Sequence, residues 1–147
     1  IAAAKDTKTT VMGFIERDGK ARLKVIGKDS FKDLIRQNVM PDAMIVTDSH
    51  LSYQGLNYEF AGHAVVNHSQ NQYKDGIFNT NSVEGAFSHF KRMLIGTQHS
   101  VSPKHLHRYC SEFEYRWNSR KLKDTDRFAQ SLSQTEGRLK WKDLIAK

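Results

Sequence analysis

The chain has 147 residues, of which 38% are hydrophobic and 27% are charged, and this composition is typical of a folded globular chain. No apolar run reaches the roughly 20 residues that a membrane-spanning helix needs, and residues 1–8 lack the apolar core of a secretion signal. A single cysteine, Cys110, excludes an internal disulfide and favours a protein of the reducing cytoplasm.

The net charge of +7 is unevenly distributed, because residues 101–147 contribute +5 of it. A basic surface favours a polyanionic partner such as DNA, since the phosphates that it neutralises release condensed counterions. A basic surface that is simply solvated explains the composition equally well.

Residues 10–16 and 20–26 flank Asp18-Gly19, which predicts a β-hairpin with a type I′ turn. A two-residue loop pairs positions whose numbers sum to 37. One mostly apolar face is then expected to carry Met12, Phe14, Glu16, Ala21, Leu23 and Val25. We interpret this hairpin as scaffold.

Ser30 is a suitable N-cap for a helix that ends before Pro41. The apolar run at 43–46 then predicts a strand buried on both faces, which ends in Asp48. Ligands gather at the carboxyl ends of strands in sheets covered by helices, so Asp48 is a candidate for chemistry. Alternatively, Asp48 only caps a helical turn over residues 49–54.

Residues 79–92 predict the opening of a helix that Gly96 ends. Glu84 and Lys91 are seven residues apart and therefore project from the same side of this helix. Two other interpretations stay open: Glu84 completes a capping box that begins at Asn81, and Lys91 is an ordinary exposed lysine.

The remaining segments are predicted as scaffold. Residues 60–66 predict an edge strand, residues 67–80 a loop, and Ser102-Pro103 the start of a helix whose apolar stripe contains Cys110. A short helix after Asp124 and a final docked segment complete the chain. Their expected apolar residues are Phe128, Leu132, Leu139, Trp141 and Leu144.

A carboxylate at a strand end, a second one in a packed helix and a nearby lysine favour metal-assisted phosphoryl transfer. Mg²⁺ prefers hard oxygen ligands, and two such ions can activate the attacking oxygen and stabilise the leaving one. The histidines show no structural-zinc spacing with cysteine. The chain also lacks a glycine-rich phosphate loop and a G-x-S-x-G motif.

An ordered series of motifs resembles the ISXO-like branch of bacterial insertion-sequence transposases, from about residue 8 to about residue 120. The motifs are TDSHLSY (47–53), VNHS (66–69), NTNSVE (79–84), KR (91–92), GTQH (96–99), SPKHL (102–106) and EFEYRWN (112–118). The resemblance implies an α/β, RNase H-like fold, a mixed sheet flanked by helices, with a DDE-type active site.

The resemblance also implies roles for individual residues. Asp48 is the second catalytic acid and Glu84 the third, and both are ligands of Mg²⁺ or Mn²⁺, with two ions expected. Some members of the branch carry asparagine at the third position, so Asn81 is a substitute ligand. The basic residues expected to contact DNA are Lys91, Arg92, Lys104 and Arg116.

The chain departs from this pattern at the first catalytic aspartate, which the family carries in a strand ahead of the hairpin. Asp6 and Asp18 do not match that motif. We therefore expect one metal ligand and the first strand to be missing, and the polypeptide alone to be weakly active or inactive.

The resemblance predicts a catalytic domain over residues 1–120 and a basic helical tail over residues 121–147 packed on it. It predicts cleavage and strand transfer at the terminal inverted repeats of an insertion sequence, by a protein of the bacterial cytoplasm and nucleoid. The joining of two element ends argues for a homodimer. The rival interpretations are a non-catalytic DNA-binding remnant or regulator and a nuclease of the same fold.

Overall fold

The computed structural model describes residues 9–27, 30–66, 74–75, 78–99 and 101–145. The elements in chain order are β1 (Val11–Ile15), β2 (Ala21–Val25), α1 (Phe31–Asn38), β3 (Met44–Asp48), η1 (Leu51–Tyr53), η2 (Leu56–Tyr58), β4 (Gly62–Val66), β5 (Lys74–Asp75), β6 (Phe78–Asn79), α2 (Asn81–Met93), the π-helical η4 (Leu94–Gln98), η5 (Pro103–His105), α3 (Leu106–Asn118), α4 (Asp124–Ser133) and α5 (Trp141–Ile145). Most of the predicted loop at 67–80, including His68 and Tyr73, lies outside the described residues, as does Asp6.

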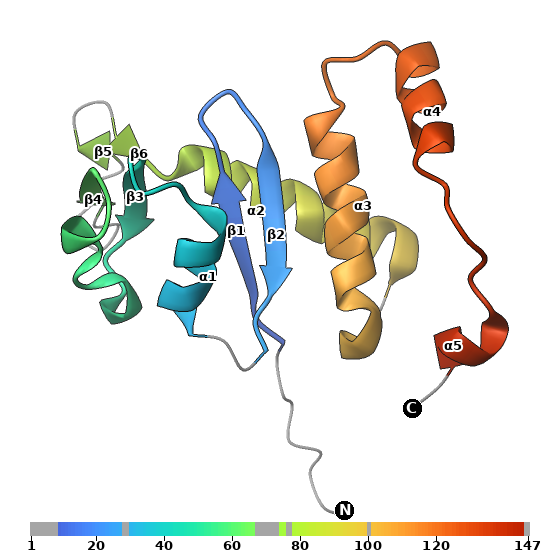
Figure 1. Ribbon diagram of the computed structural model, residues 1–147, viewed down its shortest axis with the longest axis horizontal. Helices are drawn as coiled ribbons and strands as arrows, with labels where there is room; N and C mark the ends of the chain where they lie inside the picture. Colours follow the sequence, from blue (N-terminus) through green and yellow to red (C-terminus); the bar gives the residue numbers. More distant parts are fainter. Residues whose placement is uncertain (1–8, 28–29, 67–73, 76–77, 100, 146–147) are drawn as a thin grey trace, which may run out of the picture.

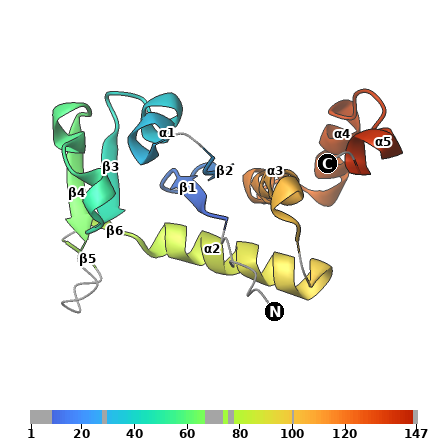
Figure 2. The same cartoon turned by 90° about the horizontal axis from the view of Figure 1, so that it is seen from below.

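Small sheets and flanking helices make this a mixed α/β fold (Figure 1). Within the described residues the strands form two-stranded ladders, β1 with β2 antiparallel, β3 with β4 parallel, and β5 with β6 antiparallel. Figure 2 shows α2 running beneath the hairpin and α3 beside it. Within the same residues, no helix is long and apolar enough to cross a membrane.

The predicted hairpin register was wrong by one residue. Val11 lies opposite Val25 and Ile15 opposite Ala21, so paired positions sum to 36. The Glu16 amide donates to the Lys20 carbonyl at 2.9 Å, which closes a three-residue loop with Asp18 in the left-handed region at φ 56°. A one-residue slip moves one strand's side chains to the other face, and the two apolar sets therefore point in opposite directions.

Two hydrophobic clusters result, one on each face of the hairpin. The α1 cluster contains Met12, Leu34, Ile35, Ile45, Leu56 and Phe60. The α3 cluster contains Leu23, Ala86, Phe90, Leu106, Cys110 and Phe113. Each face of the hairpin therefore packs against one of the two clusters.

Gly13 is the point of closest approach between the hairpin and α2. A Cβ atom there would lie 2.9 Å from Phe87 Cε2 and 3.1 Å from Leu23 Cδ2. The absence of a side chain at Gly13 therefore lets the Phe87 ring lie against the backbone of β1.

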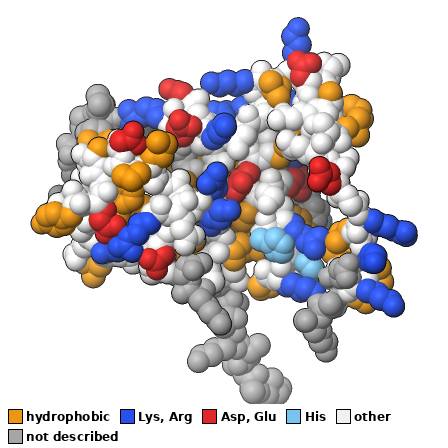
Figure 3. All heavy atoms as spheres, viewed as in Figure 1, with side chains coloured by type: hydrophobic (Ala, Val, Ile, Leu, Met, Phe, Trp, Pro, Cys, Tyr) orange, Lys and Arg blue, Asp and Glu red, His pale blue; other side chains and the backbone are white. Residues whose placement is uncertain are grey.

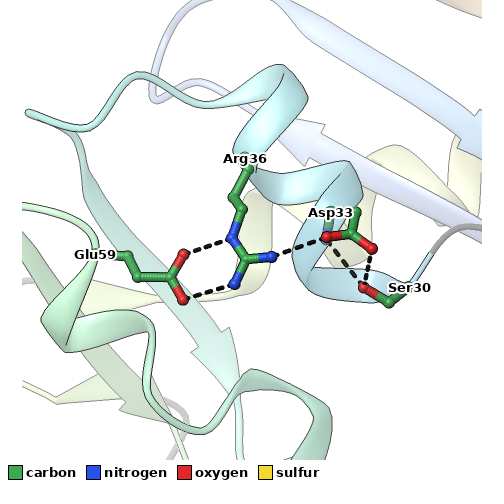
Figure 4. Close-up of polar contacts among 4 residues, drawn as sticks. All are labelled: Ser30, Asp33, Arg36 and Glu59. Atoms are coloured by element: carbon green, nitrogen blue, oxygen red, sulfur yellow. Dashed lines mark hydrogen bonds and ion pairs between the residues drawn. The ribbon is translucent and has the colours of Figure 1, made fainter.

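Helix α1 begins as predicted, with the Ser30 hydroxyl accepting from the Asp33 amide. Arg36 ties this helix to the segment after β3, because its Nε and Nη2 donate to Glu59 at 2.6 and 2.9 Å (Figure 4). Its Nη1 also donates to Asp33 at 2.8 Å. The bond from Arg36 lowers the pKa of Glu59, and the bond from Ser30 is the main cause of the lowered pKa of Asp33.

Strand β3 is covered on one face only, so the prediction of burial on both faces was wrong. Ile45 belongs to the α1 cluster, while Met44 on the opposite face is 54% exposed. The prediction of an edge strand after residue 60 is confirmed, because β4 pairs in parallel with β3.

The predictions for helices α2 and α3 were confirmed only in part. Helix α2 begins at Asn81, within the stretch predicted to open a helix, but the chain stays helical through Gly96 as η4. The helix after Ser102-Pro103 is confirmed, and Cys110 is buried in its stripe. Burial is the main reason that the pKa of the Cys110 thiol rises to about 11, so this cysteine packs and is a poor nucleophile.

The last two helices lie beyond α3, on the side away from β1 and β2 (Figure 1). The helix predicted after Asp124 is present as α4, but Phe128 and Leu132 are 65% and 56% exposed. Trp141 in α5 is 70% exposed, so its side chain is not buried as a docked segment requires. Lys104 Nζ donates to the Leu144 carbonyl at 3.2 Å.

Candidate active site

A cleft of about 1640 Å³ runs between β1 and β3. Its walls also include one side of α1 and the first three turns of α2, and it continues past the hairpin tip to α3 and α4. Asp48, Glu84 and Lys91 all line this cleft. Three of the side chains that the sequence predicted therefore line the same cleft.

Asp48 occupies the carboxyl end of β3 and is exposed. Its Oδ1 accepts from the His50 amide at 3.1 Å, so the carboxylate does support the turn that precedes η1. Among the described residues, no hydrogen bond reaches Oδ2, which leaves that oxygen available to a ligand. The pKa of Tyr53 is raised mainly by burial and then by the nearby charge of Asp48.

Glu84 is in the first turn of α2, and the alternative interpretation of a capping box that begins at Asn81 does not hold, because Asn81 is not the N-cap. The N-cap is Thr80, and its hydroxyl donates to Glu84 Oε1 at 2.7 Å. Thr80 is 6% exposed. This buried hydroxyl restricts the orientation of the carboxylate toward the cleft.

Lys91 lies two turns further along α2 and is exposed at the cleft wall. Neighbouring Arg92 is not part of that wall, and its Nη2 lies 3.1 Å from His89 Nδ1. Asn81 is exposed at the start of the helix and does not line the cleft either. The helix thus presents Glu84 and Lys91, and not the other two predicted residues, to this space.

Two predicted DNA contacts lie away from the cleft. Lys104 precedes α3 and binds the Leu144 carbonyl, and Arg116 pairs with Glu112 at 2.7 Å on the exposed side of α3. Figure 3 shows lysine, arginine and histidine side chains gathered around the first turn of α3 and α5. This basic area is separate from the two acids.

The donor chemistry of the cleft suits a hard cation only in part. Asp48 and Glu84 offer carboxylate oxygens, which Mg²⁺ prefers. Within the described residues, however, no group of three or more His, Cys, Asp or Glu side chains is placed to hold a metal. By donor type alone, these two acids could supply only some of the ligands of a magnesium ion, and the others would come from water, substrate or another acid.

Two polar residues that support the acids were not predicted. Thr80 holds Glu84, and Thr47 Oγ1 lies 2.8 Å from His63 Nε2 across the β3–β4 ladder, directly before Asp48. Burial lowers the pKa of His63. A threonine immediately ahead of a helix is a possible N-cap signal, whereas nothing local in the sequence indicates the Thr47–His63 contact.

A mixed α/β domain with Asp48, Glu84 and Lys91 on one cleft is consistent with the transposase class of proteins. Residues 2–118 match the model of the ISXO2-like transposase domain, and the chain therefore belongs to this family. It is similar to a protein of Haemophilus influenzae described as an uncharacterized transposase-like protein, with 29% identity over 90 residues that cover 61% of this chain and 72% of the relative. No solved structure matches the chain.

Proposed function

We propose that this chain is the catalytic domain of a DDE-type transposase, which cleaves DNA at the ends of an insertion sequence and joins them to target DNA. Membership of the family supports a transposase-related function. The observation that carries the proposal is that Asp48 and Glu84, although distant in sequence, line one cleft. The proposal also requires an RNase H-like fold, with which the mixed α/β arrangement of two-stranded ladders and helices is consistent.

In this proposal Asp48 and Glu84 hold Mg²⁺ or Mn²⁺. The bound ions, two in the full site, would activate the attacking oxygen and stabilise the leaving oxygen of a phosphodiester. The Thr80 hydroxyl keeps Glu84 oriented. Lys91, from the same wall of the cleft, would meet the phosphate as a point charge.

The DNA is proposed to extend from the cleft over the basic side chains of Lys91, Arg92, Lys104 and Arg116. Residues 1–120 would form the catalytic domain and residues 121–147 a basic tail packed on it. The protein would act in the bacterial cytoplasm, at the nucleoid, on terminal inverted repeats and target DNA. Two copies would be needed to hold two element ends.

Metal binding provides the first test. Calorimetric titration with Mn²⁺ should show binding that Asp48→Ala or Glu84→Gln weakens about tenfold or more, because each change removes a carboxylate ligand. Glu112→Gln is the matched control, since this acid pairs with Arg116 away from the cleft and its loss should leave Mn²⁺ binding unchanged. Equal binding by all variants would refute the assigned ligands.

DNA cleavage provides the second test and separates the rival function. We expect weak or no nicking of terminal-repeat DNA with Mg²⁺, because among the described residues no third acid is placed with Asp48 and Glu84 to hold a metal. Robust nicking that Asp48→Ala abolishes would show that two acids suffice. Salt-sensitive DNA binding without any metal binding would favour a DNA-binding remnant or regulator.

A further inference from the structure

Trp141 is exposed in a part of the chain that otherwise carries positive charge. Its side chain is 70% exposed, whereas tryptophan side chains are on average highly buried in folded proteins. Residues 138–144 hold Arg138, Lys140 and Lys142 against one acid, which gives a net charge of +2. The side chains of these three cations are exposed as well. The segment therefore combines an exposed aromatic face with cations on both sides of it in the sequence.

The first turn of α3 lies beside this segment. Lys104 Nζ donates to the Leu144 carbonyl at 3.2 Å, which places the end of α5 next to the residues that precede α3. His107 and Arg108 are exposed there. The pKa of His105 is lowered, first by desolvation and then by the charges of Lys104 and Arg108. The cations of α3 and α5 therefore belong to one basic area (Figure 3), which consists of Lys104, His107, Arg108, Arg138, Lys140, Trp141 and Lys142.

The charge of the basic area is not neutralised by the carboxylates of the described residues. The ion pairs formed within the described part of the chain use other cations, among them Arg36, Arg116 and Arg127. The partner of Lys104 is a carbonyl, which carries no charge. The area therefore presents its positive charge to an anionic partner.

Two other exposed aromatic side chains have different surroundings. Tyr58 is exposed in η2, but the charged residue next to it is Glu59. Phe128 is exposed in α4, whose first turn is acidic. Of these three exposed aromatic residues, Trp141 is the one that is surrounded by cations.

A nucleic-acid strand with unpaired bases matches both features of the basic area. Its phosphates are neutralised by lysine and arginine and release counterions, and an unpaired base stacks on an aromatic face. A protein partner would have to desolvate several cations in order to cover one indole ring. A lipid surface fits less well, because α5 has five residues, little more than one helical turn, and lacks the extended apolar face of an interfacial helix.

We propose that the basic area binds a single-stranded stretch of nucleic acid, with an unpaired base stacked on Trp141 and phosphates beside Arg108, Lys140 and Lys142. This inference goes beyond the proposed function, which concerns cleavage of DNA at Asp48 and Glu84. It does not depend on that function, because the basic area is separate from the two acids and needs no metal ion.

Fluorescence anisotropy of the full chain in EDTA, with a labelled oligothymidylate of about ten nucleotides, tests the inference. Trp141→Ala should weaken binding by about tenfold or more, because the stacking platform of one base is lost. Trp141→Phe keeps an aromatic face and should retain most of the affinity. Phe128→Ala is the matched control and should bind like the unsubstituted chain, because this exposed ring has no cations around it.

A duplex of the same length separates stacking from charge. Its bases are already stacked on one another, so Trp141→Ala should weaken duplex binding by less than about twofold. Lys142→Gln should reduce the slope of log affinity against log salt concentration by about 0.7 for the single strand, because one phosphate contact is lost. Lys32→Gln in α1, on the other side of the hairpin, is the control and should leave this slope unchanged.

An oligouridylate of the same length, measured in parallel, decides whether the strand is DNA or RNA, and the Trp141→Ala loss is required of whichever binds more tightly. Equal affinity of Trp141→Ala and the unsubstituted chain, or an equal loss on the duplex, would overturn the inference. So would binding to phosphatidylserine vesicles without binding to either oligonucleotide. None of these variants changes a residue that lines the cleft, so Mn²⁺ binding by Asp48 and Glu84 can succeed or fail independently.

Discussion

The two hydrophobic clusters of this molecule carry different parts of the candidate site. The α1 cluster packs around the base of β3, which ends at Asp48. The α3 cluster packs around α2, which presents Glu84 and Lys91. The hairpin is the element shared by both. The proposed active site is therefore assembled between two packing units, and a change in either core can move one acid relative to the other.

The largest effect is expected when a buried aromatic residue of the α3 cluster is truncated. Phe90 is 4% exposed and its ring lies edge-on to Phe113 at 5.4 Å. Phe90→Ala should lower the free energy of unfolding by about 3–5 kcal/mol, and Leu56→Ala in the α1 cluster by about 2–5 kcal/mol. Urea denaturation followed by circular dichroism measures both.

Phe128→Ala is the control for these core substitutions, because its side chain is 65% exposed and the change should stay within about 0.5 kcal/mol. If unfolding of the Leu56→Ala variant occurred in two separate steps, the clusters would be independent units. A Phe90→Ala variant as stable as Phe128→Ala would contradict the packing described for α2 and α3.

An intermediate effect is expected from Asn118→Ala, which uncovers the β2 edge. The Ala21 N–H and C=O would each lose a partner in a part-buried position, at a cost of about 1–3 kcal/mol. Asn57→Ala is the matched control, because Asn57 is exposed in η2. Faster exchange of the Ala21 amide should accompany the loss of stability, and unchanged exchange would show that α3 does not protect this edge.

The smallest effect is expected from the exposed Arg36–Glu59 pair that anchors the α1 cluster. The lowered pKa of Glu59 means that its carboxylate stabilises the fold at neutral pH, and this contribution is lost as the pH falls through the lowered pKa. Glu59→Gln should therefore be less stable than the unsubstituted chain at pH 7 and equally stable at strongly acidic pH. Chemical denaturation across this range measures the difference, which must shrink on acidification if the ion pair is its cause.

Much of the fold was predictable because most helices carry local sequence signals, namely residues suited to a helix start and a regular spacing of apolar residues. Ser30 and the Ser102-Pro103 pair mark helix starts, and the stripe that contains Cys110 is buried as its spacing indicates. The hairpin register was not predictable in this way. The five residues of β1 are apolar or small on both faces, and alternation cannot select a register when both faces are buried.

In the candidate site, too, the residues were predictable from local sequence and their arrangement in space was not. Its side chains were predicted, since a strand end and a helix start mark Asp48 and Glu84. Their common cleft depends on how the two clusters meet across the hairpin, which no local pattern encodes. Phe128 and Leu132 show the same limit, because helical spacing predicts an apolar face but not what covers it.

Gly13 determines how closely α2 can pack against the hairpin. Phe87, whose ring rests on its backbone, is three residues after Glu84 and four before Lys91. Even a methyl group at this position would force the tip of the Phe87 ring to shift. The seating of α2 on the hairpin, and with it the wall of the cleft that carries Glu84 and Lys91, thus depends on a residue that has no side chain of its own.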